Sequence, residues 1–197
     1  MLRSFIALIL ICFGSIAMAA DTTATTKTAL FGGGCFWCMQ PSFDNTAGVT
    51  ATSVGYAGGD AKTATYDQVS TGKTQHVEVI QITYDPAKVT YEKLLDIYLE
   101  NIDPTDPEGQ FADKGPQYQT AVYYADDTQK AAAEKALVAL APKFKPAPIA
   151  VKLKPLSPFY AAEDYHQKYY QKNAGHYNAY KVGSGRADYI EKTWGKK

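Results

Sequence analysis

The segment Phe31–Cys38, which reads Phe-Gly-Gly-Gly-Cys-Phe-Trp-Cys, holds the residue types that thiol chemistry requires. Glycine runs occur where the backbone takes unusual φ values or where another group must approach the main chain closely. Cys35 follows the glycines at the expected start of a helix, and a helix N-terminus lowers the pKa of a cysteine thiol. These features predict a reactive nucleophile at Cys35. The alternative is a glycine turn followed by two buried and inert cysteines.

Aromatic and acidic side chains elsewhere in the chain can complete a site around that thiol. Phe36 and Trp37 can form an apolar wall that suits a small group such as a methyl, or they can fill the core instead. Tyr56 and Tyr118 lie in segments rich in glycine or proline, where a phenol can donate a hydrogen bond into a site. Asp113 lies in the same long loop as Tyr118 and can orient a donor or a water.

Glu78 is the candidate proton donor. The strand expected at residues 76–84 alternates, so Glu78 shares one face with Ile80 and Ile82. Partial desolvation there would raise the pKa of the carboxyl and keep it protonated near neutral pH, as a general acid requires. The alternative is a carboxylate that reaches solvent or pairs with a lysine.

The N-terminus has the pattern of a secretory signal. Residues 1–19 contain a basic start, an apolar run too short to span a membrane, and a small-residue cleavage site at Ala17-Met18-Ala19. Cys12 would leave with this segment. We expect an exported, periplasmic protein in which residues 20–27 form a disordered leader and residues 28–197 form one domain.

Composition narrows the classes of function. The chain has 20 basic and 20 acidic residues, so nucleic acid and membrane surfaces are not expected partners. We also expect the protein to be a monomer. Without the signal segment only Cys35 and Cys38 remain. A single C-x-x-C pair restrains little chain, so this spacing indicates redox chemistry and not a disulfide scaffold.

Periodicity and turn residues predict an α/β fold of mixed strands and helices. Alternating or apolar runs indicate strands at 28–31, 49–56, 76–84, 120–125 and 149–153. Helices are expected at 35–43 with a break or bend at Pro41, at 91–102 with Thr90 as cap, and up to residue 144 after a cap at Asp126 or Asp127. Residues 57–74 and 103–119 read as loops, and the tyrosine-rich tail from residue 159 reads as a long coil that wraps the surface.

Several motifs together resemble the A-type peptide-methionine sulfoxide reductase family. The similarity spans essentially the whole chain after the signal segment. The matching motifs, in order, are Gly34-Cys35-Phe36-Trp37, Gly55-Tyr56-Ala57-Gly58-Gly59, Gln75-His76-Val77-Glu78, Tyr84-Asp85-Pro86, Asp113-Lys114-Gly115-Pro116-Gln117-Tyr118 and Phe159-Tyr160-Ala161-Ala162-Glu163-Asp164-Tyr165-His166-Gln167.

The resemblance implies an enzyme that reduces the S epimer of methionine sulfoxide, free or within proteins, and so repairs oxidised proteins. It implies that Cys35 attacks the sulfoxide sulfur and becomes a sulfenic acid, while Phe36 and Trp37 hold the substrate methyl. Glu78 would donate a proton to the sulfoxide oxygen. The implied fold is a two-layer α/β sandwich with a ferredoxin-like core.

For the remaining residues the resemblance implies supporting roles. Tyr56 and Tyr118 would hydrogen-bond the sulfoxide oxygen, and Asp113 would help to place water or the rest of the site. No bound cofactor or metal is implied. A thioredoxin or another dithiol would act as the external reductant.

The chain departs from many family members because its tail contains no cysteine. Cys38 is therefore the only candidate for resolving the sulfenic acid on Cys35. It would do so through a disulfide, and a first helical turn holding both cysteines would have to distort for the sulfurs to bond. The alternative is a spectator Cys38, with external thiols reducing Cys35 directly.

Two other functions share the C-x-x-C motif. A thioredoxin-like disulfide oxidoreductase also places it at a helix start, but the triple glycine, the paired aromatic residues and the element order argue against that class. A metal-binding module would add His76, His166 or His176 to the two cysteines. The last two histidines are ten residues apart, a spacing that fits no compact metal site.

Overall fold

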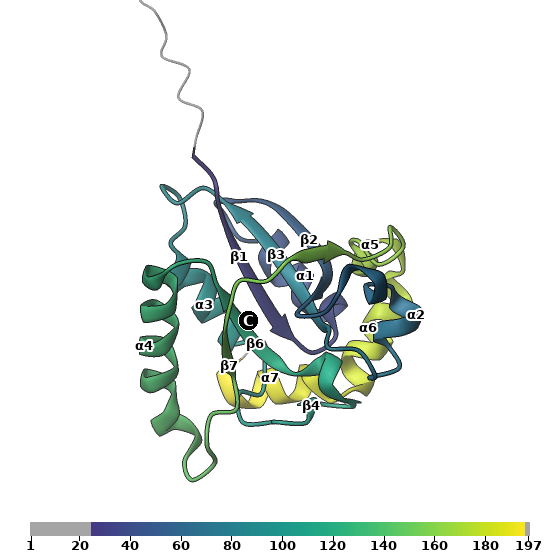
Figure 1. Ribbon diagram of the computed structural model, residues 1–197. Helices are drawn as coiled ribbons and strands as arrows, with labels where there is room; N and C mark the ends of the chain where they lie inside the picture. The colour runs from purple at the N-terminus through teal and green to yellow at the C-terminus, as the bar shows by residue number, and fades with distance from the viewer. Residues whose placement is uncertain (1–24, 196–197) are drawn as a thin grey trace, which may run out of the picture.

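The computed structural model describes residues 25–195 (Figure 1). The predicted signal segment 1–19, Cys12 and most of the predicted leader lie outside the described residues. In chain order the elements are β1 (Lys27–Gly33), α1 (Phe36–Asp44), β2 (Val49–Ala57), η1 (Ala61–Thr63), α2 (Tyr66–Val69), β3 (Val77–Tyr84), α3 (Tyr91–Leu99), β4 (Gly109–Gln110), β5 (Asp113–Lys114), η2 (Pro116–Tyr118), β6 (Thr120–Tyr124), α4 (Asp127–Phe144), β7 (Lys152–Pro155), β8 (Phe159–Ala161), α5 (Tyr169–Lys172), α6 (Ala174–Gly183) and α7 (Arg186–Trp194).

A six-stranded sheet forms the centre of the molecule, in the order β7-β6-β1-β3-β2-β8. The four inner strands pair antiparallel, and together with α1 and α3 they have the βαββαβ order of a ferredoxin-like core. At the edges, β7 pairs parallel with β6, and β8 pairs antiparallel with β2. The predicted mixed α/β sandwich is confirmed. None of the helices within residues 25–195 is long and apolar enough to cross a membrane.

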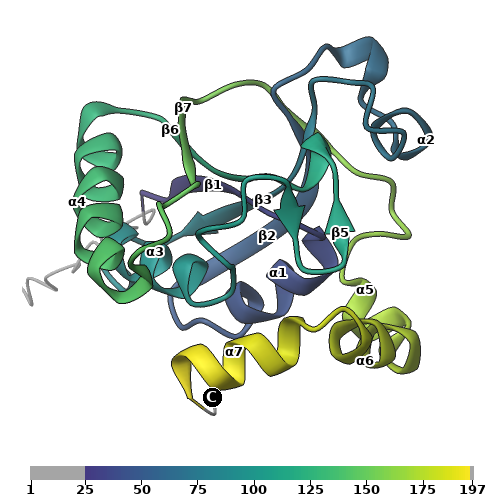
Figure 2. The same ribbon diagram turned by 90° about the horizontal axis from the view of Figure 1, so that it is seen from below.

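The main core lies between the sheet and helices α1 and α3, with α4 packed beside α3 (Figures 1 and 2). Phe31 of β1 stacks on Tyr98 of α3 at 4.8 Å between ring centroids, and Phe43 of α1 packs at 6.0 Å from Phe31. A smaller cluster that includes Val77, Val79 and Phe159 occupies the other face. In Figure 1 the segment between β7 and β8 crosses in front of β1 and β3 on that face.

Helices α3 and α4 begin where the sequence places caps. Thr90 accepts a hydrogen bond from the Lys93 amide at 3.2 Å at the start of α3, and Asp126 accepts one from the Gln129 amide at 2.8 Å at the start of α4. Pro41 does not break α1, which continues to Asp44. Burial of Phe36, Met39 and Phe43 along this helix outweighs the hydrogen bond that proline cannot make.

Four segments differ from the sequence-based expectation. Residues 57–74 contain η1 and α2, residues 103–119 contain β4, β5 and η2, and the strand expected at 149–153 begins at Lys152. The predicted C-terminal coil is wrong, since β8 and three helices occupy it. Helices α5, α6 and α7 start without a side-chain cap, so the usual N-terminal signal is missing from the sequence.

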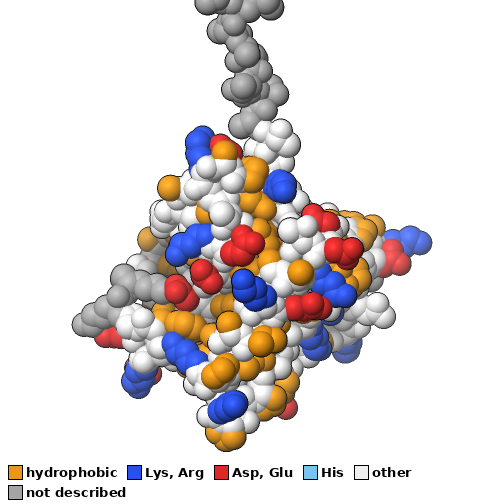
Figure 3. Space-filling view, turned by 90° about the vertical axis from the view of Figure 1, so that its left-hand side faces the viewer, with side chains coloured by type: hydrophobic (Ala, Val, Ile, Leu, Met, Phe, Trp, Pro, Cys, Tyr) orange, Lys and Arg blue, Asp and Glu red, His pale blue; other side chains and the backbone are white. Residues whose placement is uncertain are grey.

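Charges of both signs are interspersed on the surface. Figure 3 shows the face that carries α4, where lysine and glutamate or aspartate side chains alternate among apolar patches. On α4 itself Lys130 lies 3.9 Å from Glu134, an exposed pair. No single sign of charge dominates this face.

Candidate active site

A small cavity of about 90 Å³ opens at the N-terminal end of α1. It brings together residues from α1, α2, β3, β5, η2 and α6. Six of its residues were expected from the sequence and two were not. The lining residues are Cys35, Phe36, Trp37, Tyr66, Glu78, Asp113, Tyr118 and Tyr180.

The glycine turn before Cys35 allows close approach from two directions. Gly34 has φ of 77°, and a Cβ there would lie 2.5 Å from Gln110 Cβ and 2.8 Å from Arg186 Nη2. A Cβ on Gly33 would lie 2.7 Å from the sulfur of Met39. Any larger residue would therefore push these neighbours away. Cys35 follows as the N-cap of α1, with φ of −53° and ψ of 117°, so its own backbone is not yet helical.

Glu78 lies at the floor of the site and is 2% exposed. Its Oε2 accepts a hydrogen bond from the Phe36 amide at 3.1 Å. Burial raises the pKa of this carboxyl to about 8, although the Phe36 hydrogen bond opposes the shift. Glu78 is thus a protonated acid at neutral pH, as its strand face predicts, and not a solvent-exposed carboxylate.

The two cysteines hydrogen-bond to each other, and their pKa values move in opposite directions. Burial and the bond to Cys38 raise the pKa of Cys35 well above its ordinary value, so the expected lowering by the helix N-terminus is wrong. The hydrogen bond from Cys35 and the positive charge of Arg186 lower the pKa of Cys38. Both cysteines are buried free thiols. The thiolate therefore forms more readily at Cys38 than at Cys35.

Three tyrosines approach the cavity, but Tyr56 is not one of them. The Tyr56 hydroxyl donates to Glu163 Oε2 at 2.9 Å, and Tyr56 does not line the cavity, which corrects its expected place beside the reacting oxygen. Tyr66 lines the cavity together with Tyr118. Burial raises the pKa of both, so they remain phenols that can donate hydrogen bonds.

The sequence places Tyr180 in a tail expected to wrap the surface, yet its side chain reaches the cavity from α6. Its hydroxyl donates to Asp113 Oδ2 and also hydrogen-bonds Cys35. Sequence reasoning missed Tyr66 because it stands alone in a polar segment. It missed Tyr180 because the contact with Asp113 joins residues that are 67 positions apart. A lone aromatic residue in a polar segment was the only available signal for Tyr66.

Contacts with the tail fix the ring of Trp37. Tyr169 stacks on it at 3.9 Å with an interplanar angle of 8°, and the Trp37 Nε1 donates to His166 Nδ1 at 3.0 Å. Phe36 is 1% exposed and packs 6.0 Å from the Tyr56 ring. The two rings therefore present a rigid apolar wall beside Cys35.

Each of the three histidines has a polar partner other than a cysteine. His76 Nε2 lies 2.9 Å from the Asp60 carbonyl oxygen, His166 accepts from Trp37, and His176 Nδ1 lies 3.1 Å from the Tyr169 hydroxyl. Among residues 25–195, no group of three or more histidine, cysteine, aspartate and glutamate side chains is placed to hold a metal ion.

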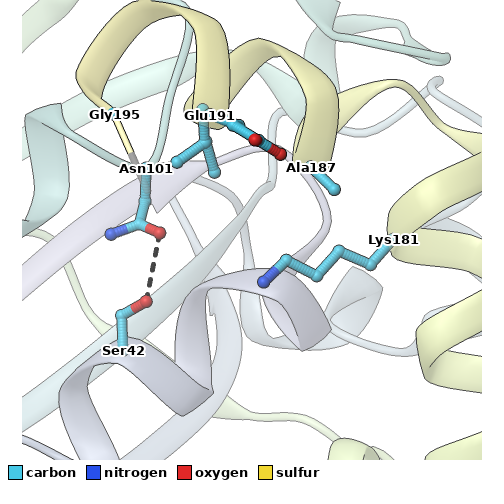
Figure 4. A pocket seen from close by; sticks show the side chains of 7 residues that line it. Ser42, Asn101, Lys181, Ala187, Glu191 and Gly195 are labelled. Carbon is cyan, nitrogen blue, oxygen red and sulfur yellow. Dashed lines mark hydrogen bonds between the residues drawn. The ribbon is translucent and has the colours of Figure 1, made fainter. Parts of the chain in front are cut away.

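A larger hollow of about 340 Å³ lies between α1, the end of α3 and α7 (Figure 4). Ser42 donates to Asn101 Oδ1 at 3.1 Å, and Lys181 extends from α6 toward α1. Its described lining residues include no cysteine, tyrosine or histidine. The reactive groups are therefore gathered in the smaller cavity.

Comparison with known proteins gives one consistent result. The family model "Peptide methionine sulfoxide reductase" matches residues 27–197. The peptide methionine sulfoxide reductase MsrA of Halalkalibacterium halodurans is 49% identical over 172 residues, which cover 86% of this chain and 97% of that protein.

Solved structures agree with the sequence comparison. Methionine sulfoxide reductase A of Corynebacterium diphtheriae has a TM-score of 0.71 and 37% identity, covering 76% of each chain. Reduced Mxr1 of Saccharomyces cerevisiae has a TM-score of 0.73 and 30% identity, covering 78% of this chain and 88% of that one. A structure of Mxr1 in complex with Trx2 shares the fold, with a TM-score of 0.53 and 23% identity, covering 75% of this chain and 86% of that one.

Proposed function

Because the chain belongs to the peptide methionine sulfoxide reductase family, we propose that it reduces the S epimer of methionine sulfoxide, free or within proteins, at Cys35. The observation that carries this proposal is the pairing of the Cys35 thiol with a protonated, fully buried Glu78 in one cavity. A nucleophile beside an acid is what transfer of oxygen from sulfur to sulfur requires.

The first step forms one bond and breaks another. The Cys35 sulfur attacks the sulfoxide sulfur while Glu78 gives its proton to the sulfoxide oxygen. Since Glu78 Oε2 accepts the Phe36 amide, Oε1 is the oxygen that can carry this proton. Oxygen passes to Cys35 as a sulfenic acid, methionine leaves, and the Cys35 proton returns to Glu78.

The other lining residues orient the substrate. Phe36 and Trp37 hold the methyl group against their rings, and the phenols of Tyr66 and Tyr118 donate hydrogen bonds to the sulfoxide oxygen. Asp113 holds the Tyr180 hydroxyl near Cys35. The site thus stabilises the negative charge that develops on oxygen as the sulfur–oxygen bond lengthens.

Recycling runs through Cys38 and an external dithiol. The Cys38 thiol already hydrogen-bonds Cys35, and the non-helical backbone of Cys35 places the pair across the first turn of α1. This contact supports a Cys35–Cys38 disulfide across that turn. A thioredoxin-like protein is the proposed reductant, a role supported by the Mxr1 complex with Trx2.

Separated epimers and thiol counting test the proposal. The wild-type protein should release methionine from the S sulfoxide and leave the R sulfoxide unchanged, and Cys35→Ser should release none. One turnover without reductant should remove two titratable thiols if Cys38 resolves the sulfenic acid. Loss of one thiol would support direct recycling, and equal use of both epimers would refute the stereochemical assignment.

We further propose that the enzyme is an exported monomer that repairs oxidised proteins outside the cytoplasm. Support comes from the signal pattern in residues 1–19 and from the family match, which begins only at residue 27. Cell fractionation should find the shortened protein outside the cytoplasm, and sedimentation should give the mass of one chain. A full-length cytoplasmic protein would contradict the export proposal.

A further inference from the structure

Arg186 is a fully buried cation at the first turn of α7. It is 1% exposed, and its guanidinium donates to the Asn101 carbonyl at 2.6 Å and to the Gly33 carbonyl at 2.8 Å. Nη1 lies 3.6 Å from the sulfur of Met39. The charge thus lies beneath the glycine turn and against α1, beside the residue that follows Cys38.

This charge has no carboxylate partner. Among the described residues, no aspartate or glutamate oxygen lies within 4.0 Å of Arg186, and the ring of Phe111 covers the guanidinium at 4.6 Å. The sequence has only one other arginine, Arg3, and uses lysine elsewhere. Burying an unpaired charge is costly, so a group that benefits from this charge is expected nearby.

We propose that Arg186 is a positioning residue for recycling, whose guanidinium keeps Cys38 as the thiolate that attacks the sulfenic acid on Cys35. The inference rests on the proposed function and assigns the tail a part in the reaction. The Cys38 sulfur forms a bond to the Cys35 sulfur, the sulfur–oxygen bond breaks, and hydroxide takes up a proton and leaves as water. The cysteine pair is then a disulfide, ready for an external dithiol.

Of the positive charges around Cys38, Arg186 has the largest effect on the pKa of its thiol. The hydrogen bond with Cys35 does most to lower the pKa of Cys38, and burial opposes it. Among the charged groups, Arg186 and, more weakly, Lys181 lower this pKa, while Asp113 raises it. The negative charge of Cys38 in turn raises the pKa of Glu78 and Tyr177. Of the two cations, Arg186 is the one held rigidly, because two backbone carbonyls and a ring fix its plane.

The glycines explain how the guanidinium reaches this position. A Cβ on Gly34 would lie 2.8 Å from Arg186 Nη2, so the turn before Cys35 leaves room for the arginine as well as for substrate. A purely structural role would be to tie α7 to the rest of the domain. That role predicts a loss of stability and an equal effect on both chemical steps, which an experiment can separate from the proposed one.

The test follows the two steps separately after mixing one equivalent of S sulfoxide with reduced enzyme. Methionine release reports the first step, and disulfide formation, measured by mass after acid quench, reports the second. Arg186→Gln removes the charge and keeps amide donors, whereas Arg186→Lys keeps the charge. Lys192→Gln removes one cation from the exposed face of α7, where Lys192 pairs with Asp188, and serves as the control.

We expect Arg186→Gln to slow disulfide formation about fivefold at pH 7 and about tenfold at pH 6, since a pKa of Cys38 raised by about one unit from about 7 lowers the thiolate fraction by these factors. The pH at which the rate of disulfide formation is half-maximal should rise by about one unit in this variant. Its methionine release, and both steps in the control variant, should stay within about twofold of the wild type. Arg186→Lys should keep a midpoint close to that of the wild type. An unchanged second step in Arg186→Gln, or equal slowing of both steps, would overturn the inference.

Two further outcomes remain decisive. If the glutamine variant does not fold, the pH midpoint of disulfide formation in Arg186→Lys decides the question. A midpoint equal to that of the wild type supports the inference, and one as high as the pKa of a free cysteine, about 8.5, overturns it. If the wild-type protein forms no Cys35–Cys38 disulfide, the proposed recycling route itself fails. Failure of the route is thus distinguishable from failure of the role of Arg186.

Discussion

Burial of Glu78 should leave a signature in the stability of the protein as well as in its activity. The carboxyl is 2% exposed, and its pKa is about 8 in the folded protein against an ordinary value of 4.5. Because the folded pKa is raised, folding takes up a proton between these two values. The stabilisation is complete below pH 4.5 and is lost as the pH rises toward about 8.

The magnitude follows from this difference in pKa. Each pKa unit corresponds to about 1.4 kcal/mol, so the ionisation of Glu78 in the unfolded chain lowers the free energy of unfolding by about 5 kcal/mol over this range. Glu78→Gln keeps an acceptor for the Phe36 amide and cannot ionise. The variant should match the wild type within about 1 kcal/mol near pH 5 and exceed its stability by about 4 kcal/mol near pH 8.

Urea unfolding of reduced protein at four pH values between these limits measures the effect. Glu134→Gln is the control, since it removes an exposed carboxyl on α4. The difference between wild type and Glu78→Gln should grow steadily with pH, and the control should follow the wild type. Parallel curves for wild type and Glu78→Gln would refute the assignment of a buried, protonated acid.

Three further outcomes are expected. Glu78→Gln should slow methionine release by about 10² to 10⁴, as loss of a general acid does. In the wild type the rate of methionine release, measured by rapid quench, should fall as the pH rises above about 8. Tyr66→Phe should lower kcat/KM about tenfold, because Tyr66 lines the cavity. Tyr56→Phe should lower the free energy of unfolding by about 1 kcal/mol and leave kcat/KM nearly unchanged, because the Tyr56 hydroxyl donates to Glu163 outside the cavity. Thr90→Ala should lower the free energy of unfolding by about 1 kcal/mol and leave activity unchanged, as a lost helix cap does.

Local signals in the sequence were sufficient for the parts of the site that lie on regular elements. The two-residue alternation of β3 places Glu78 on the same face as Ile80 and Ile82, although residues 77–80 are buried on both faces of the strand. Cys35 was placed by the glycine turn that precedes α1. The order of elements indicated an α/β fold, and the resemblance supplied the ferredoxin-like core. The neighbours of each strand in the sheet are set by long-range pairing, which periodicity does not encode.

The rest of the site depends on contacts between distant residues. Tyr66 begins a four-residue helix within a polar segment, so no periodicity marks it. Tyr180 and Arg186 belong to a tail whose helices lack caps and form against α1. Trp37 is fixed by His166, 129 residues further along the chain. The pKa of Cys35 is raised mainly by burial, and that of Cys38 is lowered mainly by the hydrogen bond with Cys35 and then by Arg186. The C-x-x-C spacing shows none of these influences.

Trapping the intermediate tests the central claim most directly. Cys38→Ser should release one methionine per enzyme from S sulfoxide, and dimedone, which reacts with sulfenic acids, should then label Cys35 alone. Peptide mass spectrometry identifies the labelled residue, and Cys35→Ser measured in parallel should give neither methionine nor label. Methionine release by Cys35→Ser, or a label on any other residue, would contradict the account.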